Sequence, residues 1–340
     1  MVREDDFVYN PRVSVSAPVG PINRNKLGRN GVMSPLYTVF RTHDINTTYL
    51  EHYFKTKCWH LFMKMNGDSG ARFDRFSIAT SLFMEMPIPY PEMDEQAKIG
   101  GYFDELDKLI TLHQRKCDET KKLKKYMLQK MFPQNGQSVP EIRFEGFTDD
   151  WEQRKLGDIY GSIGNAFVGT ATPYYVEQGH FYLESNNVKD GQINHNSEIF
   201  INDEFYKKQK DKWLHTGDMV MVQSGHVGHA AVIPEELDNT AAHALIMFRN
   251  PKEEIEPYFL NFEYQTDKAK RKIENITTGN TIKHILASDM LEFLIDVPKY
   301  EEQKQIASHF RNLDHLITLH QNKCEELKKL KKFMLQNMFV

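Results

Sequence analysis

Amide, hydroxyl and basic side chains gather in turn-rich segments of the second half of the chain. Such groups donate and accept the hydrogen bonds that distinguish base edges in a DNA groove. Two glycines nearby, Gly225 and Gly228, would let the backbone approach a ligand closely. The candidate side chains are, in chain order, Thr172, Tyr174, Asn186, Asn187, Lys189, Gln223, Ser224, His226, Asn280 and Lys283.

A second group of candidates lies near the N-terminus, where four basic side chains stand among flexible neighbours: Arg12, Arg24, Lys26 and Arg29. Cationic side chains pair with phosphate groups and so position a protein on nucleic acid, whereas contacts to base edges read its sequence. The competing interpretation of both groups is that they are ordinary polar loop residues. On the first interpretation, the segments 10–29 and 222–229 are the expected binding loops.

No pattern in the chain indicates catalysis or a bound cofactor or metal. A phosphate-binding loop, an HExxH motif and a glycine-rich methyl-donor fingerprint are all missing from the sequence. Asn10-Pro11 is followed by Arg-Val rather than the Pro-Pro-aromatic run of an adenine methyltransferase. Glu302-Gln303-Lys304 fits the tail of a nuclease motif, but it begins a repeated helix and is interpreted as structural. We therefore predict a protein that is not an enzyme.

Composition places the chain in the class of ordinary globular proteins. It has 340 residues, 40% hydrophobic content and a net charge of −4, which suggests two or three domains and argues against an indiscriminate nucleic-acid coat. The three cysteines are too scattered for a disulfide framework or a zinc site. The sequence has no membrane span or signal-peptide core. We expect a soluble cytoplasmic protein.

The candidate loops must be positioned by larger elements, and a long internal repeat shows what these are. Residues 91–132 and 298–339 share 26 identical residues in 42 positions at a shift of 207 residues. Each copy begins with a proline, Pro91 or Pro298, and continues as one long predicted helix. A period this long excludes a solenoid of short units. It indicates two copies of a large unit, each ending in a helix.

Both helices carry an apolar seam that alternates steps of four and three residues, as in a coiled coil. In the first copy the seam is Ile99, Phe103, Leu106, Ile110, His113 and Cys117, and in the second it is Ile306, Phe310, Leu313, Ile317, His320, Cys324 and Leu327. After Leu327 the stripe is expected to slip to Leu330, Met334 and Met338. The seam histidines and cysteines are interpreted as packed structural residues rather than metal ligands.

Charge along the helices favours antiparallel pairing. Residues 92–108 have a net charge of −4 and residues 114–132 a net charge of +5, while 299–315 are balanced and 321–340 carry +3. Antiparallel helices would place each basic end beside an acidic or neutral beginning, although exposed charges contribute only modestly. The predicted fold class is α+β, with two recognition-type domains separated by an antiparallel coiled coil.

The repeat also predicts that the first domain is partial. Traced backwards, residues 1–90 match the second domain only from about residue 213, so the counterpart of residues 141 to about 210 is missing. The predicted segments are a partial first domain (1–90), a spacer helix (91–133), a linker (134–150), a second domain (151–297) and a C-terminal spacer helix (298–340).

Taken together, the chain resembles the specificity subunit of type I restriction-modification enzymes. The resemblance rests on LGDI (156–159), GTATP (169–173), YLESNNV (182–188), GDMVMVQSG (217–225) and a P…EQ…I pattern at the start of both helices. It implies a non-catalytic subunit whose two recognition domains read a bipartite site in double-stranded DNA. It further implies two methyltransferase subunits and, through the complex, restriction subunits as partners. S-adenosylmethionine, ATP and Mg²⁺ would be bound by those partners.

Two alternatives remain at this stage. The chain could be a truncated, decoy-like interaction protein that binds methyltransferase subunits through its coiled coil without full DNA recognition. It could also be a stand-alone nuclease, which magnesium-dependent cleavage by the purified chain would reveal.

Overall fold

A computed structural model describes residues 1–340 except 70–73, 135, 280–282 and 340. The chain forms two compact units, which we call unit 1 (residues 1–118 and 318–340) and unit 2 (residues 119–317). The long helices α4 (Met93–Lys130) and α10 (Tyr300–Asn337) each contribute one part to either unit. The compact units therefore divide the two predicted spacer helices rather than ending at them.

Unit 1 is built on a small antiparallel sheet with the strand order β2-β1-β3. Its strands are β1 (Phe7–Tyr9), β2 (Ile22–Arg24) and β3 (Thr38–Phe40), and its short helices are α1 (Thr47–Tyr53), α2 (His60–Asn66) and α3 (Thr80–Met84). Asn46 caps α1 by accepting hydrogen bonds from the backbone of Thr48 and Tyr49. The core of this unit contains Phe7, Leu50 and Met63 packed with Phe103 of α4 and Phe339.

Unit 2 contains a four-stranded antiparallel sheet with the order β12-β11-β14-β5. These strands are β5 (Tyr160–Asn165), β11 (Met219–Val222), β12 (Ala230–Val232) and β14 (Leu245–Pro251). A second sheet has the order β13-β7-β10-β6, and β15-β4 and β8-β9 form separate two-stranded sheets. Their strands are β4 (Glu152–Lys155), β6 (Tyr175–Val176), β7 (His180–Leu183), β8 (Val188–Lys189), β9 (Gln192–Ile193), β10 (Phe200–Ile201), β13 (Ala241–Ala242) and β15 (Leu294–Val297).

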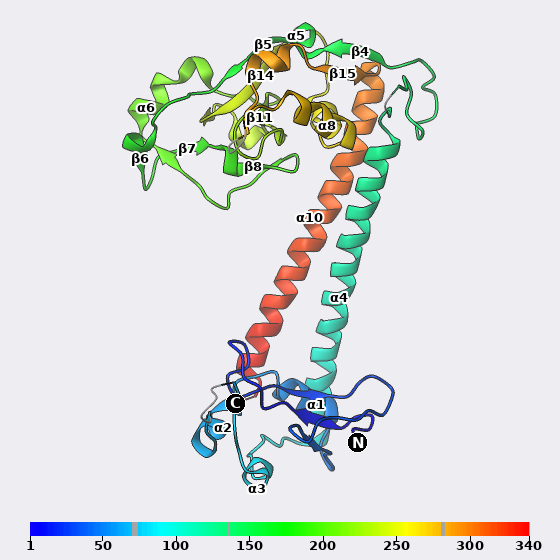
Figure 1. Ribbon diagram of the computed structural model, residues 1–340, viewed down its shortest axis with the longest axis vertical. Coiled ribbons are helices and arrows are strands. Elements are labelled where there is room, and N and C mark those ends of the chain that lie inside the picture. The colour runs from blue at the N-terminus through cyan, green and yellow to red at the C-terminus, as the bar shows by residue number, and fades with distance from the viewer. Residues whose placement is uncertain (70–73, 135, 280–282, 340) are drawn as a thin grey trace. The chain divides into compact units, whose positions relative to one another are not determined.

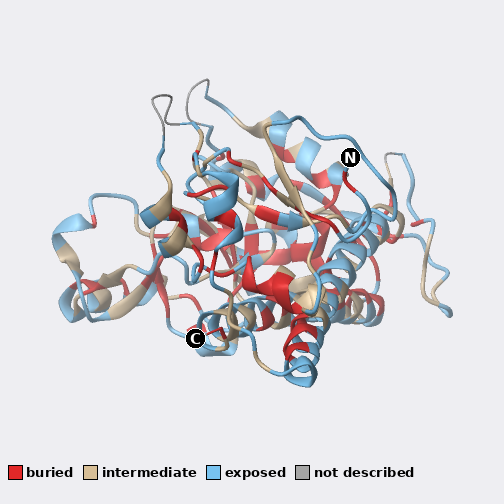
Figure 2. Cartoon of the chain, turned by 90° about the horizontal axis from the view of Figure 1, so that it is seen from below, coloured by how far each residue is buried: buried red, intermediate tan, exposed pale blue. Residues whose placement is uncertain are grey.

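Short helices cover the sheets of unit 2: α5 (Leu156–Ile159), α6 (Asp203–Lys208), α7 (Pro257–Glu263), α8 (Asp267–Ile276) and α9 (Ala287–Leu291). The described residues of unit 2 also form four 3₁₀ turns: η1 (Thr172–Tyr174), η2 (Ser185–Asn187), η3 (Lys210–Lys212) and η4 (Glu235–Leu237). The main core joins sheet residues such as Met219 and Phe248 to Phe132 of the segment after α4 and Phe310 of α10. Figure 2 shows the buried residues gathered in the interior, with exposed residues along the outer helix surfaces.

The two long helices lie antiparallel within each unit (Figure 1). In unit 1, His113 Nδ1 lies 3.1 Å from His320 Nδ1, and an earlier residue of α4, Asp107, pairs with a later residue of α10, Lys331. In unit 2, Lys124 Nζ lies 2.6 Å from Asp314. Positions that rise along one helix therefore fall along the other, which confirms the predicted orientation.

The predicted seam is largely buried. Ile99, Phe103, Leu106, Cys117, Ile306, Phe310, Leu313, Cys324 and Leu327 are buried, while Ile110, His113, Ile317 and His320 are half-buried. The expected slip to Leu330 is wrong, because Leu330 is 39% exposed and Lys331 takes the seam position, where its ammonium group reaches Asp107. The coiled-coil register thus continues through Lys331 to Met334 and Met338, which pack against the core of unit 1 as predicted.

The contacts of each unit repeat those of the other. Asp107 and Lys331 in unit 1 correspond, at the 207-residue shift, to Asp314 and Lys124 in unit 2. Gln96 bonds the Asn46 backbone N–H and the Pro91 carbonyl, just as Gln303 bonds Glu256 N–H and the Pro298 carbonyl. The paired sheets agree too, since β2-β1-β3 has the antiparallel order of β12-β11-β14. In the described residues, unit 1 has no strands that correspond to β4 or to β5–β10.

The predicted linker at 134–150 is packed rather than loose. Arg143 forms two hydrogen bonds of 2.7 Å to the carboxylate of Glu302, which is 1% exposed. Ile142 and Phe144 pack against the core of unit 2. Glu302 therefore has a structural role, as expected for a residue at a repeated helix start. No described helix is both long and apolar enough to cross a membrane.

Candidate nucleic-acid interface

In unit 2, the segment 223–229 connects β11 to β12 and is held against residues 283–285. Gly225 N–H donates to the Lys283 carbonyl at 3.1 Å, and Ile285 N–H donates to the Gln223 carbonyl at 2.9 Å. Gln223 and Ser224 are half-buried, whereas the imidazole of His226 is exposed. We call residues 223–229 with 283–285 the paired loop of unit 2.

Backbone conformation in this loop depends on glycine. Gly225 and Gly228 have φ angles of +79° and +85°, a region that L side chains rarely adopt. At Gly228 a Cβ atom would also meet Ile273 of α8 at 2.8 Å. The glycines therefore turn the chain sharply and leave His226, which stands between them, at the surface.

The β8–β9 hairpin adjoins the same loop. Its turn residues Asp190 and Gly191 both have positive φ, as a two-residue hairpin turn requires. The backbone N–H of Asp190 donates to Nδ1 of His229 at 3.2 Å, and Asn261 donates to the Gly191 carbonyl at 2.8 Å. These bonds place exposed Lys189 beside the paired loop.

The groups gathered here are mostly basic, and we call them the basic cluster: Lys189, His226, His229, Lys270 and Lys283. The rings of His226 and His229 lie 6.5 Å apart. Burial lowers the pKa of His229, and although the Asp190 carboxylate opposes this, His226, Lys270 and Lys189 lower it further. His229 is therefore suited to be a neutral hydrogen-bonding group beside the ammonium groups of Lys189 and Lys270, which can meet phosphate.

His229 and Lys270 were missed as candidates from the sequence. A signal for His229 was present in the spacing HVGH (226–229), which repeats the chosen histidine three residues later. Lys270 lies in the amphipathic helix α8, where nothing in the local pattern separates it from other solvated lysines. Only the packing of α8 against the glycine turn brings it to the loop.

The structure removes Asn187 from the expected contacts. Its side chain is buried, accepts the Glu184 backbone N–H at 3.0 Å and donates to the carbonyls of Asn194 and Ser197. The amide thus closes the η2 turn and has no group left for DNA. Asn186, the neighbouring residue, remains exposed.

Thr172 and Tyr174 form the η1 turn, which belongs with the second sheet rather than with the paired loop. Tyr174 stacks on Phe205 with ring centroids 4.1 Å apart, so its face is already covered. Thr172 is exposed. Asn280 lies outside the described residues, whereas Lys283 is exposed within the paired loop.

Unit 1 has a paired loop of the same construction, between β1 and β2. Val13 N–H donates to the Asp74 carbonyl at 3.1 Å, and Phe76 N–H donates to the Pro11 carbonyl at 2.7 Å. An isolated bridge sets Arg12 opposite Arg75. Arg12 is exposed and occupies the position that Ser224 has in unit 2. Arg75 was missed from the sequence because its loop partner is 63 residues away.

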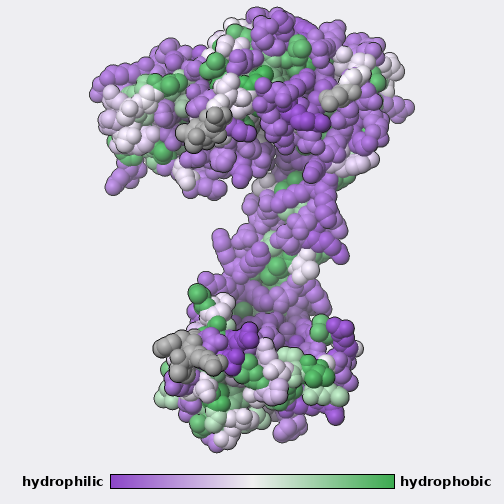
Figure 3. Space-filling view, viewed as in Figure 1, coloured by the Kyte–Doolittle hydropathy of each residue, from purple (hydrophilic) through white to green (hydrophobic). Residues whose placement is uncertain are grey.

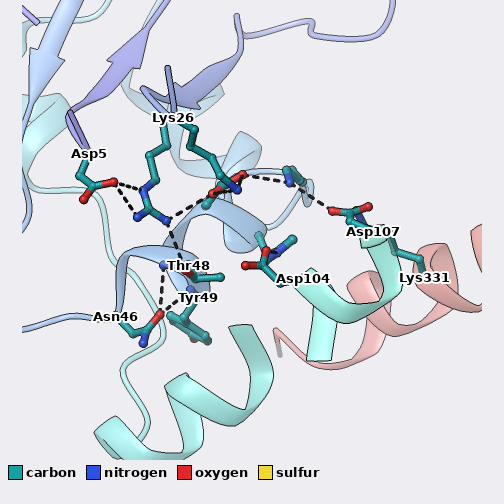
Figure 4. A network of polar contacts seen from close by, with 12 residues as sticks. Asp5, Lys26, Asn46, Thr48, Tyr49, Asp104, Asp107 and Lys331 are labelled. Atoms are coloured by element: carbon teal, nitrogen blue, oxygen red, sulfur yellow. Dashed lines mark hydrogen bonds and ion pairs between the residues drawn. The ribbon is translucent and has the colours of Figure 1, made fainter. Parts of the chain in front are cut away.

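Two of the predicted basic residues of unit 1 stabilise the fold (Figure 4). Arg24 is only 13% exposed and pairs with Asp5 at 2.7 Å and with Glu51 at 3.5 Å. The guanidinium of Arg24 thus joins β2 to α1, and the predicted DNA contact at Arg24 would require these ion pairs to open. Lys26 pairs with Glu51 at 3.2 Å but stays half-exposed.

Glu51 continues this network. Burial alone would raise its pKa, but the ammonium groups of Lys55 and Lys26 hold the pKa below its usual range. Lys55 also approaches Asp107 of α4 at 3.7 Å. Arg29, which is exposed, lies outside the network, and only its carbonyl is bonded, by Asn25.

The architecture defines a class: duplicated α+β proteins whose repeat units each include a long helix. Residues 148–329 match the family described as the type I restriction modification DNA specificity domain. The chain is 23% identical over 316 residues to the MjaVIII specificity subunit of a Methanocaldococcus jannaschii type I restriction enzyme, covering 90% of this chain and 73% of the relative. It is 26% identical over 262 residues to the putative MjaX specificity subunit of the same organism, covering 75% and 59%.

Among solved structures, the S subunit of a type I restriction-modification system from M. genitalium has the same fold. The TM-score is 0.64 at 12% identity, over all of this chain and 84% of that chain. Since the matched domain covers more than half of the sequence, the chain belongs to the family of type I restriction-modification DNA specificity subunits.

Proposed function

We propose that this chain directs a type I restriction-modification complex to its DNA target and performs no catalysis itself. The observation that supports this most directly is the basic cluster on the paired loop of unit 2, within the family-matched residues. Lysine ammonium groups there would neutralise phosphates. The Ser224 hydroxyl, the His226 imidazole and the amide of Gln223, whose Oε1 is buried in this structure, would supply donors and acceptors to base edges.

The bipartite character of the target is inferred from the second paired loop. Unit 1 sets Arg12 and Arg75 at a position equivalent to Ser224 and His284. Two loops of one construction in one chain are suited to two half-sites, the unit 2 loop with mixed donors and acceptors and the unit 1 loop with arginines. Arginine reads guanine edges and also binds phosphate.

Methyltransferase and restriction subunits are the partners that we infer from the named relatives, which are specificity subunits of type I restriction enzymes. S-adenosylmethionine, ATP and Mg²⁺ would then be bound by those partners, and the complex would act in the cytoplasm, where its DNA is. The interaction-only alternative is not favoured, because a loop with DNA-reading chemistry is present in both units.

The test is to co-express the chain with its methyltransferase subunit in a host free of other modification systems and to map methylated bases by long-read sequencing. A single bipartite motif that requires the chain is the expected result. Methylation that is absent, or identical without the chain, would contradict the proposal.

A further inference from the structure

One edge and one face of the unit 1 sheet are uncovered, whereas the equivalent surface of unit 2 is fully packed. Among the described residues, β3 has β1 as its only strand neighbour, while its counterpart β14 has β11 on one side and β5 on the other. The burial differs accordingly. All three residues of β3 are half-buried, and the matching residues Ile246, Met247 and Phe248 are buried.

The uncovered surface is an apolar groove. It is lined by residues of β3, α1, α3 and the segment after α3, including Phe40, Ile45, Phe54, Met84, Ile88 and Tyr90. Met84 and Tyr90 are each 62% exposed. Hydrophobic side chains are visible at the surface of unit 1 in Figure 3. Exposed apolar groups gathered in one groove are characteristic of a binding surface.

Unit 2 shows what covers this surface when it is filled. There β4, α5 and β5 lie over the residues that correspond to the groove. Leu156 N–H donates to the Phe293 carbonyl at 3.0 Å, and the Tyr160 and Phe248 ring centroids lie 5.7 Å apart. Gly157 passes so close to α9 that a Cβ would meet the Leu291 carbonyl at 2.9 Å.

The segment after α3 keeps the backbone hydrogen-bonding groups with which a strand equivalent to β4 would pair. In unit 2, β15 pairs with β4, and the N–H of Asp296 points instead to Glu263. The unit 1 residues that match Leu294 and Asp296 are Pro87 and Pro89. Proline has no N–H, and at these two positions the N–H would point away from an added strand, so no ladder hydrogen bond is lost.

Ile88 and Tyr90 are the alternating residues of this segment. In unit 2, the backbone groups at the equivalent positions of β15 face β4. The backbone groups of Ile88 and Tyr90 make no backbone hydrogen bond within the described part of the chain. The carbonyls of Pro87 and Pro89, on the other side, accept bonds from Tyr53 and Tyr49. The extended segment 87–90 thus has hydrogen-bond partners on its inner side and is open on its outer side.

We propose that the groove of the 340-residue chain accepts, in trans, a strand–helical turn–strand segment of the kind formed by residues 151–165. The segment would carry the spacing Trp-x4-Leu-Gly-x-Ile-Tyr that unit 2 has at 151–160. It would add one strand to β3 and one to residues 87–90. Its chemistry is defined by main-chain hydrogen bonds, an apolar face, and a glycine at the close approach to the Met84 carbonyl. This inference does not rest on the DNA-binding proposal.

The experiment titrates the 340-residue chain with a fluorescent peptide of the sequence 148–166. Saturable binding is expected, with deuterium-exchange protection of residues 36–42 and 86–92. Met84→Glu in the chain should weaken binding at least about tenfold, since a charge would enter the apolar contact. Leu61→Glu is the matched control, because Leu61 is equally exposed on α2 but lies outside the groove.

A second variant tests the geometry from the peptide side. Gly157→Val in the peptide should also weaken binding about tenfold, because its side chain would collide with a backbone carbonyl. No binding by the wild-type chain, equal loss in Leu61→Glu, or protection elsewhere would overturn the proposal. So would a dimer of the chain that Met84→Glu dissolves but that the peptide does not compete away, since the same face of a second copy, rather than such a segment, would then cover the groove.

Discussion

At the residue scale, similar side chains close together in sequence have different roles because packing differs. Arg24 and Arg29 are five residues apart, yet one joins β2 to α1 and the other lies in the solvent. Asn186 and Asn187 are adjacent, and only the second is turned inward to close η2. Composition and spacing predict that a loop is polar, but not which amide has its partner inside the protein.

Glu263 gives a pH-dependent prediction. It is buried, its Oε1 accepts the Asp296 N–H at 3.0 Å, and burial raises its pKa to about 8. The folded state thus keeps a proton that the unfolded chain loses above its ordinary pKa, so stability falls as pH rises toward about 8.

Glu263→Gln should remove this loss. The variant is expected to melt close to the wild type near pH 5 and about 2–4 °C higher near pH 8.5, measured by thermal unfolding. A difference between the two proteins that is the same at both pH values would show that Glu263 does not titrate as described.

The histidine pair of unit 1 gives a prediction of the opposite sign. Burial lowers the pKa of His113, and the nearby His320 lowers it further. The folded state therefore binds fewer protons than the unfolded state, and stability is lost as pH falls below the ordinary histidine value of about 6.5.

His320→Gln should make the melting temperature less sensitive to acid than that of the wild type. Because burial also lowers the pKa of His52, His60, His229 and His309, the wild-type decline is shared. The quantity to compare is thus the difference in melting temperature between variant and wild type, measured at about pH 7.5 and at about pH 5.5. An unchanged difference would exclude the pair as a contributor.

At the element scale, the repeated ion pairs on the long helices provide a matched comparison. Lys124 and Asp314 are 11% and 17% exposed, whereas Lys331 and Asp107 are 15% and 41% exposed. Burial raises the pKa of Asp314 despite the Lys124 ammonium beside it. The unit 2 pair is therefore more sensitive to loss of its lysine.

Lys124→Met should destabilise the chain by roughly 3 kcal/mol, because it leaves a buried carboxylate without a partner. Lys331→Met should cost roughly 1 kcal/mol or less, because solvent reaches Asp107. Denaturant unfolding of both variants checks the order. Equal costs would mean that burial does not set the strength of these pairs.

The helix seam makes a prediction about assembly. Leu313 is 7% exposed and packs in the unit 2 core, and Ile317 is half-buried on the same stripe. Replacing both with aspartate should separate the helices and abolish co-purification with a methyltransferase subunit. Leu316, which is 42% exposed beside them, supplies the control Leu316→Asp. Retained co-purification of the double variant would contradict a role for the seam.

The internal repeat allowed the long helices and the corresponding strands to be predicted from the sequence. The repeat indicated which strands of the two units correspond, and the charge along the helices indicated their antiparallel pairing, because each signal is spread over many residues. The helix register near Lys331 could not be predicted, since a lysine stem fills an apolar seam while its ammonium group reaches Asp107. Lys270 and Arg75 were missed because contacts distant in sequence bring them to their loops.

At the scale of the whole molecule, the chain carries two versions of one unit, and they are unequally complete. Unit 2 has both sheets and a basic cluster, while unit 1 keeps the paired loop and leaves its sheet uncovered. We therefore expect unit 2 to read DNA by itself, whereas DNA reading by unit 1 should depend on what occupies its groove.

The central claim is that the paired loop of unit 2 reads DNA sequence. The measurement that tests it most directly is the methylated motif specified by Gln223→Ala with His226→Ala, compared with Lys207→Ala on exposed α6 as the control. The account predicts that one half of the motif relaxes, by about 1–3 kcal/mol of lost discrimination per contact, while the other half and complex assembly remain. An unchanged motif in the double variant would contradict it.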